Sequence, residues 1–186
     1  MQRSCWTTAA WLAALVAASP LAAQDFTVAA GLFAQSQPGV APTRWGSGGV
    51  LAVDFGSGQA PIRAEVGYAR TDYSVLGDDY HSHYGNVLVG LASRGRPGRD
   101  RTNVGLYIGV GARVRDDVSE TDPTFASSAE WQSLVSPGFT FDVRLTESTS
   151  VAVLARYYLT GIAGSIIDSA ERDVRSSFGL MVGLRR

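Results

Sequence analysis

The sequence NVGLYIGVGARV, residues 103–114, alternates apolar residues with glycine or polar residues over its whole length. Side chains of a β-strand point alternately to its two faces, so this segment predicts a strand with one wholly apolar face. A strand that crosses a bilayer needs roughly 9 to 11 residues, whereas strands of soluble sheets have about five or six. The segment therefore predicts a membrane-crossing strand. Its apolar positions are Val104, Leu106, Ile108, Val110, Ala112 and Val114.

The same alternation recurs in eight segments, separated by breaks rich in Gly, Pro, Asp or Ser. This pattern predicts an all-β fold, an eight-stranded antiparallel up-and-down transmembrane β-barrel. The alternative is a soluble periplasmic ligand binder like the lipocalins, in which the apolar residues point inward. The predicted strands are residues 26–35, 45–55, 62–70, 81–93, 103–114, a segment within 131–145, 150–160 and 174–185.

The first 23 residues predict a cleavable signal peptide. They contain one charge, Arg3, an apolar stretch over residues 6–18 and the small-residue end Leu21-Ala22-Ala23, which predicts cleavage before Gln24. The apolar stretch is shorter than the roughly 17 to 25 residues of a spanning helix. Cys5 is the only cysteine, so no disulfide is expected after cleavage. The predicted domains are the signal peptide, residues 1–23, and one barrel, residues 24–186.

Overall charge provides no evidence for a nucleic-acid partner. The formal net charge is −1, and all 16 basic residues are arginine. A nucleic-acid-binding domain usually has a strongly basic face. We therefore expect no nucleic-acid binding.

Loop lengths predict the orientation of the barrel. With the N-terminus in the periplasm, the connections at residues 36–43, 71–80, 115–127 and 161–173 lie outside the cell. The connections at 56–60, 94–101 and 146–148 lie inside. Bacterial barrels keep short turns inside and longer loops outside, and this arrangement broadly follows that rule. Pro137 lies within the sixth segment and lacks an N–H group for the ladder, so we expect a bulge or local distortion there.

Charged residues recur on the parity opposite to the apolar face, which predicts a charged lumen. An arginine facing lipid near the bilayer midplane would cost about 2 to 4 kcal/mol. The interior of an eight-stranded barrel is just wide enough for its own side chains, so we expect ion pairs to fill it rather than a wide pore. A narrow ion-selective path is the alternative. The predicted lumen network comprises Asp54, Arg63, Glu65, Arg113, Asp142, Arg144, Arg156 and Arg175.

Aromatic residues on the outward parity predict membrane-interface belts, which tyrosine and tryptophan commonly form. They lie towards the ends of the predicted strands. The residues are Phe26, Phe55, Tyr68, Trp131, Phe141 and Tyr157.

Catalytic chemistry is suggested only by the segment before the fourth strand, with Asp78, Asp79, His81, Ser82 and His83. A serine nucleophile needs a base within hydrogen-bond reach, but neighbouring residues of a strand face opposite ways, so Ser82 is expected to face away from both histidines. Two histidines alone are weak evidence for a metal site. We expect no enzyme activity, cofactor or metal; a rim-located lipid-modifying hydrolase is the alternative.

Acidic residues in the predicted fifth loop raise the question of cation binding. They are Asp116, Asp117, Glu120 and Asp122, and they do not follow the EF-hand pattern. We therefore expect a solvated acidic loop.

The signal peptide, the eight segments and the last strand, SFGLMVGL at residues 177–184, together resemble the small outer-membrane β-barrels of the OmpA/OmpX-like family. This resemblance implies location in a bacterial outer membrane and a structural or surface-interaction role in the envelope. It also implies contact with outer-membrane lipid and lipopolysaccharide, and with periplasmic chaperones and the barrel assembly machinery. We expect a monomer. The family's last strand usually ends on an aromatic residue, but here the sequence reads Leu184-Arg185-Arg186.

Overall fold

The computed structural model describes residues 24–36, 44–56, 59–75, 78–93, 101–119, 129–161 and 175–186. The predicted signal peptide lies outside these residues. Among the described residues, no helix is long and apolar enough to cross a membrane. The strands are β1 (Gln24–Ser36), β2 (Arg44–Phe55), β3 (Ile62–Val75), β4 (Asp78–Ala92), β5 (Thr102–Ser119), β6 (Glu130–Arg144), β7 (Ser150–Thr160) and β8 (Arg175–Arg185).

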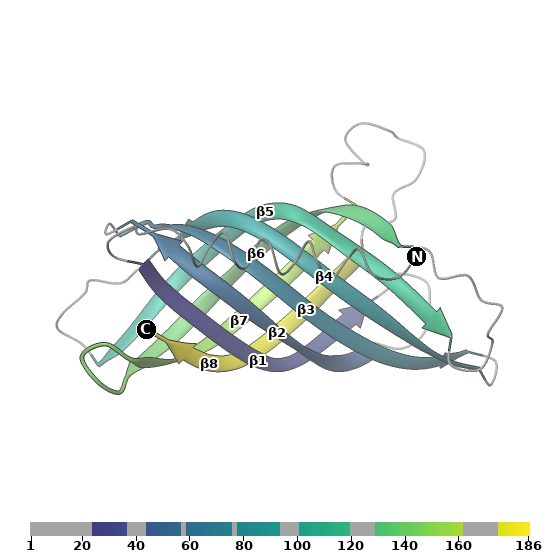
Figure 1. Ribbon diagram of the computed structural model, residues 1–186, viewed down its shortest axis with the longest axis horizontal. Helices are drawn as coiled ribbons and strands as arrows, with labels where there is room; N and C mark the ends of the chain where they lie inside the picture. The colour runs from purple at the N-terminus through teal and green to yellow at the C-terminus, as the bar shows by residue number, and fades with distance from the viewer. Residues whose placement is uncertain are drawn as a thin grey trace.

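The eight strands form one closed antiparallel sheet. Each strand pairs with its neighbours in the sequence, and β8 pairs with β1. At the closure, the backbones of Phe26 and Arg186 exchange two hydrogen bonds of 2.7 and 2.9 Å. The predicted eight-stranded up-and-down barrel is confirmed. Figure 1 shows it as an elongated cylinder in which the strands cross the long axis obliquely.

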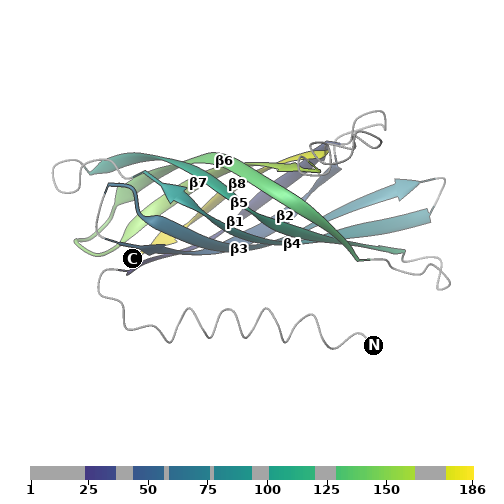
Figure 2. The same cartoon turned by 90° about the horizontal axis from the view of Figure 1, so that it is seen from above.

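The stagger of the strands determines how wide the barrel is. A line of paired residues that starts at Phe26 and passes once around the barrel returns to β1 at Ser36, ten residues further along. Such a stagger tilts the strands, typically by about 35 to 45°, and the tilt is visible in the perpendicular view of Figure 2. With eight strands, the interior is filled by side chains.

The outside of the barrel is apolar and the inside carries charge. On β5, Leu106 is 68% exposed and Ile108 is 56% exposed, whereas Arg113 on the inward parity is 2% exposed. Soluble monomers rarely expose continuous apolar patches larger than a few hundred Å², so this surface faces lipid. The arrangement contradicts the lipocalin-like alternative, which requires an apolar interior.

Aromatic side chains lie towards the strand ends on the outer surface. Trp131 and Tyr157 are exposed there, as is Trp45, which was not among the predicted belt residues. Tyr68 is also exposed, but it lies in the middle of β3 because that strand continues to Val75. Tyrosine and tryptophan are enriched at membrane interfaces, so these residues indicate the edge of the apolar belt. We call the end of the barrel where β1 begins and β8 ends the inner rim, and the opposite end the outer rim.

Three strands extend further towards the outer rim than the sequence predicted. β3 continues to Val75, β4 begins at Asp78, and β5 continues to Ser119. The sequence predicts loops at residues 71–80 and 115–119 because most of their outward residues are polar. Side chains still point alternately inward and outward there, but the outward ones no longer form an apolar face, as is typical of a strand that has left the membrane. The acids Asp116 and Asp117 therefore belong to β5 and not to a loop.

Pro137 interrupts one ladder without changing the register. The pairing of β6 with β7 runs from Val135↔Leu159 directly to Gly138↔Arg156, so the two intervening pairs are missing. Three residue steps on one strand match three on the other, which means that no residue is inserted. The predicted local distortion is present, but it is not a bulge.

Candidate functional site

The inner half of the lumen is crossed by ion pairs built on Asp54 and Arg63. These residues are direct partners in the β2–β3 register, which places both side chains inside at the same level. Nε and Nη2 of Arg63 donate to the two carboxylate oxygens of Asp54 at 2.5 and 2.8 Å. Such a bidentate pair is among the stronger hydrogen-bonded ion pairs in proteins.

Arg185 connects this pair to two further carboxylates. Its Nη2 lies 2.6 Å from Asp54 Oδ2 and 3.3 Å from Asp25 Oδ2, and its Nη1 lies 2.8 Å from Asp142 Oδ2. Arg185 is not among the residues predicted for the lumen, although it shares the inward parity of Met181 and Gly183. The four side chains come from β8, β2, β1 and β6, so the contacts cross the lumen.

A separate pair spans the lumen between opposite walls. Arg156 on β7 places Nε and Nη2 3.3 Å from Glu65 Oε2 on β3. The guanidinium lies over the ring of Tyr107, with its central carbon 4.4 Å from the ring centroid. Both charged side chains are buried. Together with the Arg185 contacts, this pair fills the inner half of the barrel.

The middle of the lumen holds Arg113 in a cage of neutral residues. Its Nε donates to Asn86 Oδ1 at 2.7 Å, and its Nη1 donates to Ser177 Oγ at 2.9 Å. Three aromatic rings surround its guanidinium carbon at centroid distances between 5.0 and 5.6 Å. These rings belong to Phe33, Tyr84 and Tyr158.

The outer part of the lumen forms a mouth lined by arginine and tyrosine. Asp117 accepts hydrogen bonds from Ser82 Oγ at 2.5 Å and from Arg115 Nε at 3.0 Å. Nearer the rim, the guanidinium of Arg44 lies 3.5 Å from the ring centroid of Tyr73, and Tyr73 stacks on Tyr80 at 5.5 Å. Asp117 is therefore an ion-pair partner inside the barrel and not a solvated loop acid.

A second polar cluster faces outward above the apolar belt on β3 and β4. The Tyr68 hydroxyl lies 2.6 Å from His83 Nδ1, and Arg70 Nη2 lies 3.2 Å from His81 Nδ1. Arg70 Nε also donates to Asp72 Oδ1 at 2.8 Å. These residues form an outer-face cluster where the strands leave the membrane.

The electrostatic setting of His83 predicts a measurable titration. Burial lowers the pKa of His83, and Arg70 and His81 lower it further, while Asp116 and Asp72 act in the opposite direction. We therefore expect His83 to be neutral at pH 7 and to titrate below the ordinary value of about 6.5. Replacing Arg70 with glutamine is expected to raise this pKa, because one cation is removed.

The check is an NMR titration of the histidine ring signals of the refolded barrel, with His81→Asn used for assignment. Because the folded pKa of His83 lies below the unfolded one, its protonation opposes folding, and stability should fall as the pH drops through this range. A His83 pKa at or above 6.5 in the unmodified protein would contradict the prediction.

Six of the eight residues predicted for the lumen are buried inside the barrel, and two are not. The buried residues are Asp54, Arg63, Glu65, Arg113, Asp142 and Arg156.

Arg144 and Arg175 correct the prediction. Arg144 is the last residue of β6 and is exposed at the inner rim. Arg175 is the first residue of β8, where its Nη1 lies 3.8 Å from Glu130 Oε2. Parity predicts the direction of a side chain, but at a strand end that direction leads to the rim, where Arg144 is exposed and Arg175 is partly exposed.

The geometry does not support the hydrolase alternative at the fourth strand. Ser82 points into the lumen and donates to Asp117, whereas His81 and His83 lie on the outward parity. Asp79 accepts a 2.5 Å hydrogen bond from Ser74 and is exposed. Within the described ranges, no group of three or more His, Cys, Asp or Glu residues is arranged to hold a metal ion. Glu120 and Asp122 lie outside these ranges.

The same fold occurs in solved outer-membrane proteins. The crystal structure of Neisserial surface protein A superposes with a TM-score of 0.58 and 14% identity, over 87% of this chain and 95% of that one. This chain has the fold of the small eight-stranded outer-membrane β-barrels. Ail of Yersinia pestis, in complex with the heparin analogue sucrose octasulfate, superposes with a TM-score of 0.51 and 13% identity, over 89% of this chain and all of that one. No family model and no curated protein matches the sequence.

The lipid-facing belt and this fold place the barrel in a bacterial outer membrane. The resemblance to OmpA/OmpX-like barrels that the sequence suggested therefore extends to the three-dimensional structure.

Proposed function

We propose that this protein is a non-enzymatic surface-interaction barrel of the outer membrane. The observation that carries the proposal is the contrast between its two halves. Ion pairs from Arg156 to Glu65 and from Arg185 to Asp54 and Asp142 cross the inner lumen. At the other end, β3, β4 and β5 continue past the apolar belt and present polar side chains on both faces.

The projecting part of β3 and β4 is the proposed contact surface. Its backbone is an ordered two-stranded ladder, because the register between the two strands continues to the pair Val75↔Asp78. Pre-ordered surfaces lose less conformational entropy on binding than mobile loops. The two structural neighbours, a surface protein and an attachment invasion locus protein, support the proposal of a surface role.

Deleting the projection tests the proposed role. One variant replaces residues 72–81 by a two-residue Asn-Gly turn, which favours a tight hairpin. A matched control replaces the inner-rim connection 56–60 by the same turn. In bacteria that display each barrel at equal surface density, we expect the first variant to lose attachment to host cells or matrix and the control to retain it. Equal attachment by both variants would overturn the surface-contact role.

Conductance measurements test the closed lumen. In planar bilayers, the unmodified barrel is expected to show no large, stable pore, because charged side chains occupy its interior. A steady conductance like that of a general-diffusion porin would overturn this part of the proposal.

We also propose that the barrel is a monomer, that its belt contacts outer-membrane lipid and lipopolysaccharide, and that periplasmic chaperones and the barrel assembly machinery insert it. The support is the exposed apolar belt, which requires lipid on the outside and protection from water before insertion.

A further inference from the structure

Arg113 differs from the other arginines that lie deep in the lumen. Arg63, Arg156 and Arg185 each contact a carboxylate, and so does Arg115 at the mouth. Arg113 has no carboxylate partner among the residues that the structure describes. Its hydrogen-bond acceptors, Asn86 and Ser177, are neutral.

One nitrogen of Arg113 also lacks a hydrogen-bond partner. Arg113 is only 2% exposed, and its Nη2 atom is buried without a hydrogen-bond acceptor within the described part of the chain. A guanidinium remains charged at any physiological pH, and an unpaired buried polar group is strongly disfavoured. The aromatic rings of the cage stabilise the positive charge through their faces, but they leave this N–H group without an acceptor.

The lumen is polarised so that its outer half favours an anion. The inner half contains four carboxylates, those of Asp25, Asp54, Glu65 and Asp142, against three arginines. In the part of the outer half that the structure describes, Arg44, Arg113 and Arg115 lie with the carboxylate of Asp117, and at the rim Arg175 pairs with Glu130. A cluster of one sign between low-dielectric walls concentrates the opposite ion.

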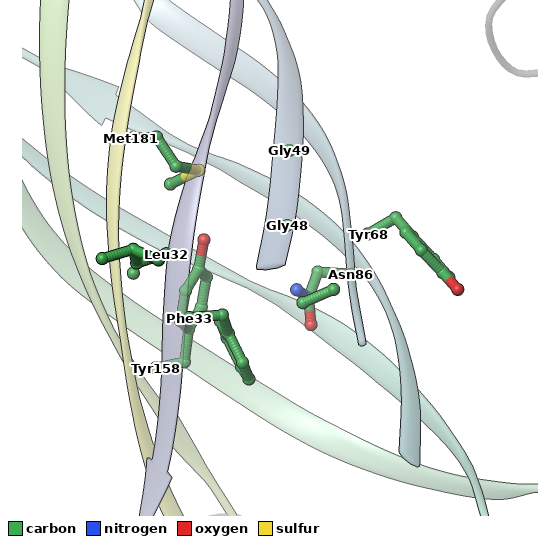
Figure 3. Close-up of a pocket in the computed structure, with 10 residues that line it drawn as sticks. Leu32, Phe33, Gly48, Gly49, Tyr68, Asn86, Tyr158 and Met181 are labelled. Atoms are coloured by element: carbon green, nitrogen blue, oxygen red, sulfur yellow. The ribbon is translucent and has the colours of Figure 1, made fainter. Parts of the chain in front are cut away.

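The space beside the cage is small. Phe33, Asn86 and Tyr158, three of the residues that contact Arg113, also line a pocket that reaches the Gly48 and Gly49 backbone (Figure 3). The rings of Phe33 and Tyr158 lie 6.0 Å apart there. Arg113 itself does not line this pocket, whose free space is about that of one water molecule. The tight packing around the cage therefore favours a small inorganic ion over an organic anion.

We propose that Arg113 binds a monovalent inorganic anion such as chloride at its Nη2 group, and that the anion enters from the outer rim. Ser177 accepts a hydrogen bond from Nη1, so its own hydroxyl hydrogen is able to donate to the same ion. Bound chloride neutralises the deep lumen arginine that has no carboxylate partner among the described residues, and it provides the missing acceptor. This inference is independent of the proposed surface-contact role.

Halide-dependent stability of the refolded barrel tests the proposal. The temperature at which the folded species is lost on unboiled gels is measured at one ionic strength, in sodium chloride, sodium bromide or sodium gluconate. We expect a saturable rise of several degrees in chloride and bromide relative to gluconate. A ligand that binds only the folded state stabilises it in this concentration-dependent way.

Three variants localise the effect. Arg113→Gln is expected to abolish the halide dependence, and Ser177→Ala to weaken it. Arg144→Gln removes the same charge from an exposed position at the inner rim, and it should leave the dependence unchanged. If Arg113→Gln does not fold, the chloride-35 NMR signal is measured with the unmodified barrel and with Ser177→Ala. We then expect the unmodified barrel to broaden the signal more than Ser177→Ala does.

Two results would overturn the anion site. The first is equal stability of the unmodified barrel in chloride and gluconate, which would indicate that a water molecule satisfies Nη2. The second is a halide dependence that survives in Arg113→Gln, or that is unchanged in Ser177→Ala when Arg113→Gln does not fold, which would place the ion elsewhere on the protein.

Discussion

Replacing Asp54 with alanine is expected to lower the free energy of unfolding of the barrel by about 3 to 5 kcal/mol. Asp54 accepts a bidentate pair from Arg63 and a 2.6 Å contact from Arg185. Its removal leaves a buried guanidinium without its main acceptor, and removing one partner of a buried ion pair has this order of effect. The measurement is urea unfolding of the barrel in lipid vesicles, followed by tryptophan fluorescence.

Two further variants separate loss of the ion pair from a general effect of substitution. Asp72→Ala removes an exposed acid that pairs with Arg70 at 2.8 Å, and it should cost at most about 1 kcal/mol, as is usual for surface pairs. The double replacement Asp54→Leu with Arg63→Leu removes both buried charges and should be less harmful than Asp54→Ala alone. If Asp54→Ala and Asp72→Ala had equal effects, the buried network would not stabilise the barrel.

Replacing Ile108 with arginine is expected to lower the free energy of unfolding in vesicles by about 2 to 4 kcal/mol. Ile108 is exposed near the middle of the outward face of β5, where an arginine would meet the hydrocarbon core. The matched control is Thr102→Arg, at the exposed start of the same strand, where the expected cost is about 0 to 1 kcal/mol.

Comparing the loss of unfolding free energy in Ile108→Arg with that in Thr102→Arg directly tests where the apolar belt lies. In a barrel with a lipid-facing outside, the cost depends on depth along β5. An equal and small cost at both positions would mean that Ile108 faces water, and the assignment of the outer surface would be wrong.

Much of the lumen follows from alternation alone. Once residues 103–114 are read as a strand with an apolar outer face, the inward direction of Arg113 is determined, and the same reasoning applies to Asp54, Arg63 and Arg156. Arg185 was omitted from the predicted lumen network, although it has the same inward parity as Met181. It ends the last predicted strand, residues 174–185, and only its contacts with Asp54 and Asp142 show that it belongs to the lumen network.

The strand extensions at the outer rim were missed for a different reason. Strands were recognised by their apolar face, and that face disappears where β3, β4 and β5 leave the membrane. The outer-face cluster of Tyr68, Arg70, Asp72, His81 and His83 depends on this extension, since the cross-strand register brings Arg70 beside His83 and Asp72 beside His81.

The amino-acid sequence by itself determined the all-β class, the number of strands, the closed antiparallel topology and the sidedness of most residues. It did so because eight segments of two-residue period, most of them long enough to cross a bilayer, favour a closed barrel with its apolar face towards lipid. The exposure of that face in the structure then contradicted the inverted, lipocalin-like arrangement. Only the tertiary structure decided which charges meet. Partners such as Arg156 and Glu65 are 91 positions apart in the chain and meet because closure of the barrel brings opposite walls within reach. Closure likewise leaves Arg113 among neutral residues, a property that no local pattern in the sequence contains.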